Sequence, residues 1–225
     1  KQFSVFNVLI IEYVFGSLFF LIVNLATGQF TFNNTTLFYA FLSTLVLSLG
    51  VYLNLKAVTS EDFSLTLPFL AFTPVFLIPI EFLFFKVVPS TFALAGIFLI
   101  ILGTFLLSWS EKRTWKIIWQ FSPTSKMMIL VAILYAFGGV FDKLGILAST
   151  PSGYLFWSFG FLTALFYLIN PYLNRKNSNW EKPLISFKKN KLGFLAIGLT
   201  VSLAALMMMT SYQTILVNYA VSIKR

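Results

Sequence analysis

Charged side chains interrupt several long apolar runs of the sequence, and they are the residues whose chemistry needs an explanation. Asp142 and Lys143 are adjacent inside the glycine-bearing run "LYAFGGVFDKLGILAS". Glu12 lies near the middle of the first apolar run, and Glu81 lies in a run with three prolines. A charge at the centre of a membrane-spanning helix costs about 2.5–3.5 kcal/mol on insertion scales. We therefore take these four as candidate substrate or cavity residues.

Asp142 and Lys143 cannot share one face of a helix, because adjacent side chains point about 100° apart. We expect them to divide their roles. Lys143 would face a central cavity, near Glu12 or the C-terminal Lys224 and Arg225, and Asp142 would meet a neighbouring helix or the headgroup layer. The alternative is that both residues lie close enough to the helix end to reach the headgroups.

Glu12 and Glu81 each allow two interpretations. Glu12 can line a cavity, or it can stay protonated and hydrogen-bonded to a neighbouring helix. Glu81 shares its run with Pro68, Pro74 and Pro79, which break the helical hydrogen-bond ladder and free backbone carbonyls. Freed carbonyls suit a cavity-lining gate, although a kinked packing helix would show the same prolines.

Small and polar residues in other apolar runs suggest packing or ligand contacts. Gly138 and Gly139 precede the charged pair by one turn and would let another helix approach closely. Four polar residues can bond a ligand or bridge helices: Asn54, Tyr212, Gln213 and Asn218.

The composition is that of a polytopic membrane protein. Hydrophobic residues make up 58% of the 225, charged residues make up 10%, and the mean hydropathy is +0.87. Soluble domains are about 45–50% apolar and about 25% charged. Because Cys and His are absent, thiolate or imidazole metal sites, disulfides and His-based catalysis are excluded. We expect no cofactor and no metal.

Seven apolar runs are long enough to cross a bilayer, and an interrupted eighth begins near residue 214. They lack the alternation of a membrane barrel, so we predict an all-α bundle of seven full spans and a partial eighth. The runs are 4–25, 37–55, 63–85, 90–109, 127–147, 152–173 and 192–212.

Two longer loops, 108–126 and 174–191, hold most of the basic residues. Trp115, Trp119 and Trp180 among their lysines are typical of interfacial anchors on short amphipathic stretches. Alternating the spans puts 12 of the 16 Lys and Arg on one side, which should be cytoplasmic. The net charge of +9 therefore reflects membrane topology, and we expect no nucleic-acid partner.

The run from "AVTSEDFSLTLPFLAFTPVF" to "KVVPSTFALAGIFLIILGTF" resembles the EamA-like family of the drug/metabolite transporter superfamily. Ala57, Pro74, a Pro89–Ser90 turn, and Gly96 with Gly103 match its first repeat, and the two glycines would serve helix packing. One position departs from the pattern, because Lys86 stands where the family often carries Glu. "YAFGGVFDKLGI" and "YAVSIKR" resemble two helices of the second repeat.

The resemblance implies a carrier with two inverted five-helix repeats that transports a small metabolite by alternating access. Residues 4–109 would form the first repeat, 110–126 the connection, and 127–225 the second repeat, in a fragment lacking the first helix and the last one to two. The membrane would be the plasma membrane of a prokaryote. A basic residue at Lys224 or Arg225 would face the substrate, so anionic or amphipathic molecules are natural ligands. The alternative is that Lys224 and Arg225 belong to a loop.

Two questions stay open at this level. Family members usually keep both termini inside, which puts the lysine-rich loops outside and contradicts the count of basic residues. A lipid-handling or scaffold protein that transports no solute has the same composition. An enzyme is not expected, because the loops hold no catalytic cluster: their one acidic pair, Glu61 and Asp62, suits a helix N-terminus.

Overall fold

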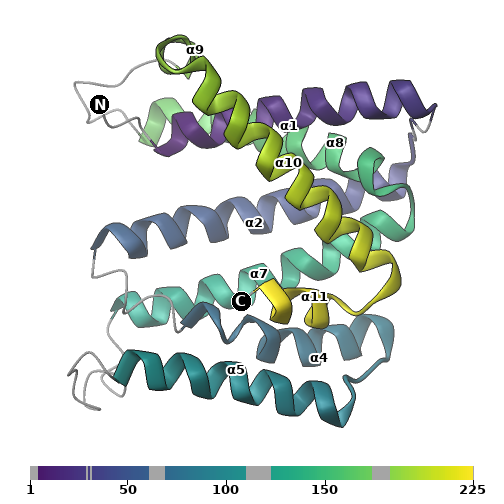
Figure 1. Ribbon diagram of the computed structural model, residues 1–225, viewed down its shortest axis with the longest axis vertical. Helices are drawn as coiled ribbons and strands as arrows, with labels where there is room; N and C mark the ends of the chain where they lie inside the picture. The colour runs from purple at the N-terminus through teal and green to yellow at the C-terminus, as the bar shows by residue number, and fades with distance from the viewer. Residues whose placement is uncertain are drawn as a thin grey trace. The chain divides into compact units, whose positions relative to one another are not determined.

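Every regular element in the described part of the chain is an α-helix. The computed structural model describes residues 5–28, 30, 32–60, 69–109, 123–173 and 183–224. No strand occurs within these ranges, so the predicted all-α membrane helix bundle is confirmed at this level. Figure 1 shows the helices in order along the chain. They are α1 Val5–Thr27, α2 Asn34–Ser60, α4 Thr73–Phe85, α5 Thr91–Trp109, α7 Pro123–Leu147, α8 Pro151–Leu173, α9 Pro183–Lys189, α10 Lys191–Thr214 and α11 Val217–Lys224.

Five of the described helices are long and apolar enough to cross a bilayer: α1, α2, α7, α8 and α10. The span predicted at 63–85 contains a break within the described residues, because Phe69 and Leu70 are helical and a turn follows them. Its helix, α4, begins only at Thr73 after a turn at Ala71 and Phe72, and its 13 residues extend about 20 Å. A bilayer core is about 30 Å thick, so α4 alone is too short to cross it. The cause is local, because Pro74 can occupy the first turn of a helix but not its interior.

Several features that the sequence analysis singled out lie outside the described residues. Pro68 lies outside, and so do Trp115, Trp119 and Trp180, together with the segment 110–122 that was expected to contain a headgroup-bound stretch. Within the loop predicted at 174–191, the structure describes one short helix, α9, which has Lys188 and Lys189 in its last turn.

The helices form two compact units. The first unit contains residues 1–44 and 144–213, and the second contains residues 45–143 and 214–225. Each unit takes segments from both sides of the connection at 110–126, and this grouping reflects packing alone. The two sequence repeats at 4–109 and 127–225 therefore stay a prediction.

In the first unit, α1 and α8 lie side by side and antiparallel (Figure 1). Buried asparagines fasten both ends of this pair. At one end, Asn24 Nδ2 donates to the Ser152 carbonyl at 3.1 Å, and Ser152 Oγ donates to Asn24 Oδ1 at 2.7 Å. At the other end, Asn170 Nδ2 donates to Asn7 Oδ1 at 3.3 Å, and Asn7 Nδ2 donates to Ser186 Oγ on α9 at 3.0 Å.

Aromatic rings fill the space between these two polar ends. Tyr13 on α1 stacks on Phe166 of α8 with 5.9 Å between ring centroids, and it meets Phe159 edge to face at 5.4 Å. Gly16 lies against the same Phe159, and a Cβ on Gly16 would be only 2.0 Å from that ring. A glycine is required here because the ring occupies the space of a side chain.

In the second unit, the C-terminal half of α2 packs closely against α7. A Cβ on Gly138 would be 2.3 Å from the nearest Leu47 side-chain atom. Gly139 is buried beside it. Gly96 and Gly103 on α5 differ, because a Cβ on either would meet no atom within 4 Å in the described part of the chain. The close approach that the sequence predicts at these four glycines is thus present at Gly138. In the described part of the chain, the two α5 glycines face open space.

We predict that Gly138→Ala lowers the free energy of unfolding in detergent by about 1–3 kcal/mol, because a Cβ at this position would overlap the Leu47 side chain and force it to shift. Gly96→Ala is the matched control on an open face. It should be neutral or raise stability by up to about 1 kcal/mol, since Ala favours a helix over Gly. Thermal unfolding of the two variants beside the parent measures both effects. Equal melting temperatures for the two variants would contradict the close α2–α7 packing.

Candidate functional site

A two-residue interruption separates the last two helices. α10 ends at Thr214, Ile215 and Leu216 are not helical, and α11 begins at Val217. The first N–H groups of a helix have no partner within it, and neither do the carbonyls of an interruption. In a membrane protein such groups need partners from the protein itself. The second unit supplies them from α4 and α7.

Glu81 on α4 caps the start of α11. Its side chain is fully buried, and its two oxygens bond two consecutive backbone amides. Oε1 accepts from Val217 N–H at 2.7 Å, and Oε2 accepts from Asn218 N–H at 3.3 Å. A carboxylate at this position also interacts favourably with the positive end of the helix dipole. The acid therefore performs the capping role that a neighbouring Ser or Asp usually performs within its own helix.

Lys143 on α7 bonds the interruption itself. Its side chain is 8% exposed, and its Nζ donates to the Ile215 carbonyl oxygen at 2.6 Å. The same ammonium lies 5.3 Å from the centroid of the Phe85 ring, a cation–π distance. Its charge and that of Glu81 attract each other. Lys143 thus points into the protein and does not extend to the headgroup layer.

Two bonds to other segments hold the first turn of α11, and a third bond lies within this helix. Asn218, which is fully buried, donates from Nδ2 to the Pro74 carbonyl at 3.0 Å and accepts from Ser222 Oγ at 3.3 Å. Tyr219 accepts at its hydroxyl oxygen from the Ser90 N–H at 3.0 Å. Because Ser90 precedes α5, this bond connects α11 to the start of that helix. α11 packs against α4 and α5, and Figure 1 shows it beside α4.

The proline-rich helix positions the acid. Pro79 lies inside α4 and cannot donate to the carbonyl four residues earlier, which loosens the ladder two residues before Glu81. α4 ends at Lys86, whose backbone is left-handed with φ 57° and whose N–H donates to the Phe82 carbonyl at 3.0 Å. The position that departs from the family pattern therefore serves as a helix C-cap, with an exposed side chain.

The structure brings together Glu81, Lys143 and Asn218 from the set predicted by sequence. Asp142 is also buried on α7. The amine of Lys143 donates to the Ile215 carbonyl, and its charge interacts with that of Glu81; proximity to Glu12 or to Lys224 and Arg225 stays a prediction. Glu12, which is half-buried, and Tyr212, which is buried, belong to the first unit.

Other predicted residues add less. Lys224 is the last residue of α11, and Arg225 lies outside the described residues. Asn54 on α2 carries a buried Oδ1 with no hydrogen-bond partner in the described ranges. Sequence reasoning missed the backbone groups of Ile215 and Val217. The signal for them was the boundary between the seventh predicted run, which ends at 212, and the eighth, which begins near 214, because backbone groups lack helical partners at such a boundary.

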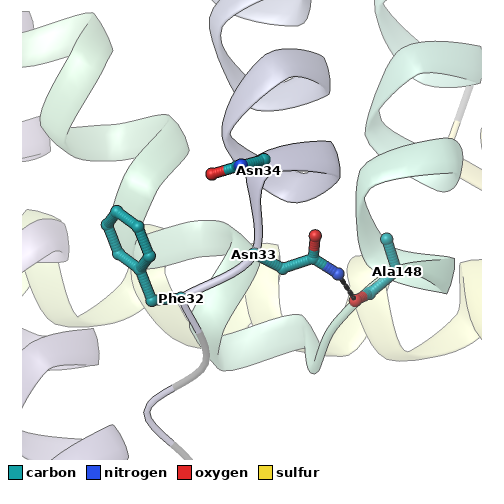
Figure 2. Close-up of a pocket in the computed structure, with 4 residues that line it drawn as sticks. All are labelled: Phe32, Asn33, Asn34 and Ala148. Carbon is teal, nitrogen blue, oxygen red and sulfur yellow. Dashed lines mark hydrogen bonds between the residues drawn. The ribbon is translucent and has the colours of Figure 1, made fainter.

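One open pocket lies elsewhere, in the first unit, and it is lined by Phe32, Asn33, Asn34 and Ala148 (Figure 2). Asn33 Nδ2 donates to the Ala148 carbonyl at 3.1 Å, as the dashed line in Figure 2 shows, and Asn33 Oδ1 caps the Thr35 N–H at 3.0 Å. These bonds fasten the start of α2, and none of the predicted cavity residues lines the pocket. It therefore does not qualify as the candidate site.

Long apolar helices and a buried acid–lysine pair at a helix interruption define a polytopic helical membrane protein. Comparison with known families shows that residues 1–109 match the model of the EamA-like transporter family. The resemblance predicted from the sequence is thereby confirmed for this part of the chain, which contains α1, α2, α4 and α5 with Glu81. The match and the apolar helices identify a membrane protein of the transporter class. No curated protein matches the chain.

A double-mutant cycle on Glu81 and Lys143 should show strong coupling. Glu81→Gln or Lys143→Met alone leaves one buried charge without its partner, and each should lower the free energy of unfolding by about 3–5 kcal/mol. The double variant removes both charges and should lose less than the sum of the two, with a coupling of about 1–3 kcal/mol. Denaturant unfolding in detergent measures all four proteins. Strictly additive losses would show that the two side chains act independently.

Proposed function

We propose that the protein is a permease that moves a small metabolite across the membrane by alternating access. The family match over residues 1–109 supports transport as the class of activity. The single observation that carries the proposal is the buried Glu81–Lys143 pair around the start of α11. Charges within spanning segments are costly to insert and usually mark a substrate or ion pathway.

The same site supports anionic or amphipathic molecules as the substrate class. Helix N-termini favour anionic groups, because their first N–H groups and the helix dipole are positive. Here the start of α11 already accepts the carboxylate of Glu81, and the Lys143 ammonium is a second positive group in the same unit. Glu12, Asp142, Tyr212, Lys224 and Arg225 remain further candidates for contact with the substrate, with Pro74 and Pro79 at the gate.

The wider architecture in this proposal is the one that the sequence predicts. It has seven full spans and a partial eighth, arranged as two inverted repeats at 4–109 and 127–225, in the plasma membrane of a prokaryote. The shortness of α4 is compatible with such a plan, because short and interrupted helices occur in transporters where they line a cavity.

Transport by the purified full-length protein in proteoliposomes tests the function. A panel of radiolabelled metabolites, weighted towards carboxylates and phosphates, should identify at least one that accumulates above empty liposomes. Lys143→Met should reduce that uptake at least about tenfold, because a buried charge-assisted contact is worth about 1.5–3 kcal/mol. Lys86→Met is the matched control, since that lysine is exposed, and it should keep parental uptake. Uptake by none of the panel would favour a lipid-handling or scaffold protein.

Membrane orientation gives a separate prediction. The chain has no Cys, so single cysteines at Lys116 and Lys182 can be labelled without background. Both loops should react from the same side, and the excess of lysine predicts the cytoplasmic side. Labelling in intact cells with a membrane-impermeant maleimide, before and after permeabilisation, measures this. Reaction of both from outside would support the usual family orientation, and reaction from opposite sides would disprove the predicted number of spans.

A further inference from the structure

The two hydrogen bonds of Glu81 can both form at full strength only when the carboxyl group is ionised. Both of its oxygens accept from backbone N–H groups, one from Val217 and one from Asn218. A protonated carboxyl has one hydroxyl oxygen, which is a donor and accepts poorly. Protonation would also remove the negative charge that attracts Lys143 and the dipole of α11. One proton therefore weakens three contacts at once.

The two bonds from Glu81 hold the start of α11. Asn218 and Tyr219 provide its other described ties, through Pro74 and Ser90. Both attach within the first three residues of α11. The N-terminal turn is thus where α11 is held, and Glu81 supplies two of the four bonds there.

The surroundings contain few other groups that could take up the proton. From α7, Lys143 is the charged group that interacts with Glu81, and the buried Asp142 is its neighbour in sequence. α5 carries no charged residue. On α11, Tyr219 accepts the Ser90 N–H, and Lys224 lies at the opposite end. On α4 itself, Lys86 is exposed after the last turn.

We propose that Glu81 is a proton-operated latch: its ionised form holds the first turn of α11, and uptake of one proton on its carboxylate releases that turn. The proton comes from water and binds an Oε atom of Glu81. No other covalent bond forms or breaks. Lys143 keeps its bond to the Ile215 carbonyl, so the release begins at the amide side of the interruption. As a means of coupling transport to protons, the latch depends on the proposed function; as a conformational device, it does not.

Cysteine accessibility tests the latch without any substrate. Val217 and Ala136 are both small, fully buried residues of the second unit, and neither position contains a native thiol. Single cysteines at Val217 (the reporter) and Ala136 (the control) are reacted with a water-soluble maleimide in the full-length protein in nanodiscs. The ratio of the two rates reports opening at α11 and cancels general loosening and most of the pH dependence of thiol chemistry.

At neutral pH, Glu81→Gln should raise the reporter-to-control ratio about tenfold, because Gln keeps the size of the side chain but not the charge. Mild acid should raise the ratio of the parent towards that of Glu81→Gln, and the Gln variant should no longer respond to pH. Lys143→Met should keep the response. Glu81→Asp, which keeps a titratable group, should also respond and covers the case that the Gln variant fails to fold.

An unchanged ratio in Glu81→Gln, or a pH response that persists in it, would overturn the latch even if transport is found. Failure of transport with an intact pH response would overturn only the proposed function.

Discussion

Backbone hydrogen bonding at the Ile215–Leu216 interruption is the constraint on which the second unit depends. An interrupted helix exposes amides and carbonyls that water cannot reach inside a membrane protein, and each unsatisfied group costs several kcal/mol. Glu81 bonds the amides and Lys143 bonds a carbonyl. The two side chains come from α4 and α7, so satisfying one interruption fixes three helices together. A buried pair of charges is tolerable here because each charge also makes a charge-assisted bond to the backbone.

In the first unit, uncharged polar side chains connect the helices. Amides and hydroxyls fasten α1 to α8 at both ends, and rings fill the length between them. These asparagine bonds do not respond to pH, because neither partner titrates. The contrast between the units is therefore chemical. The connections of the first unit are insensitive to pH and membrane charge, whereas that of the second unit contains an acid and a base.

Sequence alone predicted the parts of this structure that depend on apolar length. Long uninterrupted runs make helices in lipid whatever surrounds them, so α1, α2, α7, α8 and α10 were predictable. The break before α4 was not predicted, because composition does not distinguish a continuous apolar helix from one with a turn at Ala71 and Phe72. α9 lies in a lysine-rich loop, where periodicity over 7 residues carries little information.

The candidate site was predictable only as a set of unpaired charges. Insertion cost marks Glu81 and Lys143 individually, but not as partners, because they are 62 positions apart in the sequence and meet only through α11. The sequence indicated that Asp142 and Lys143 diverge by about 100° and need separate partners, but it did not identify the Ile215 carbonyl as the acceptor for Lys143. Residue identity does not show that a backbone group such as the Ile215 carbonyl needs a partner. The break between the last two apolar runs was the sequence feature that indicated it.

The asparagine pairs between α1 and α8 also bear on how the protein is made. Asn24 bonds a residue 128 positions later, and Asn7 bonds one 163 positions later. At about 5–20 residues per second of synthesis, α1 is complete roughly 6–30 s before α8 exists. During that interval α1 carries two amides and Glu12 without their final neighbours. Its other residues are mostly apolar and must keep α1 in the bilayer until α8 has been made. Early insertion therefore favours apolar side chains in α1, whereas the later pairing with α8 needs its polar ones.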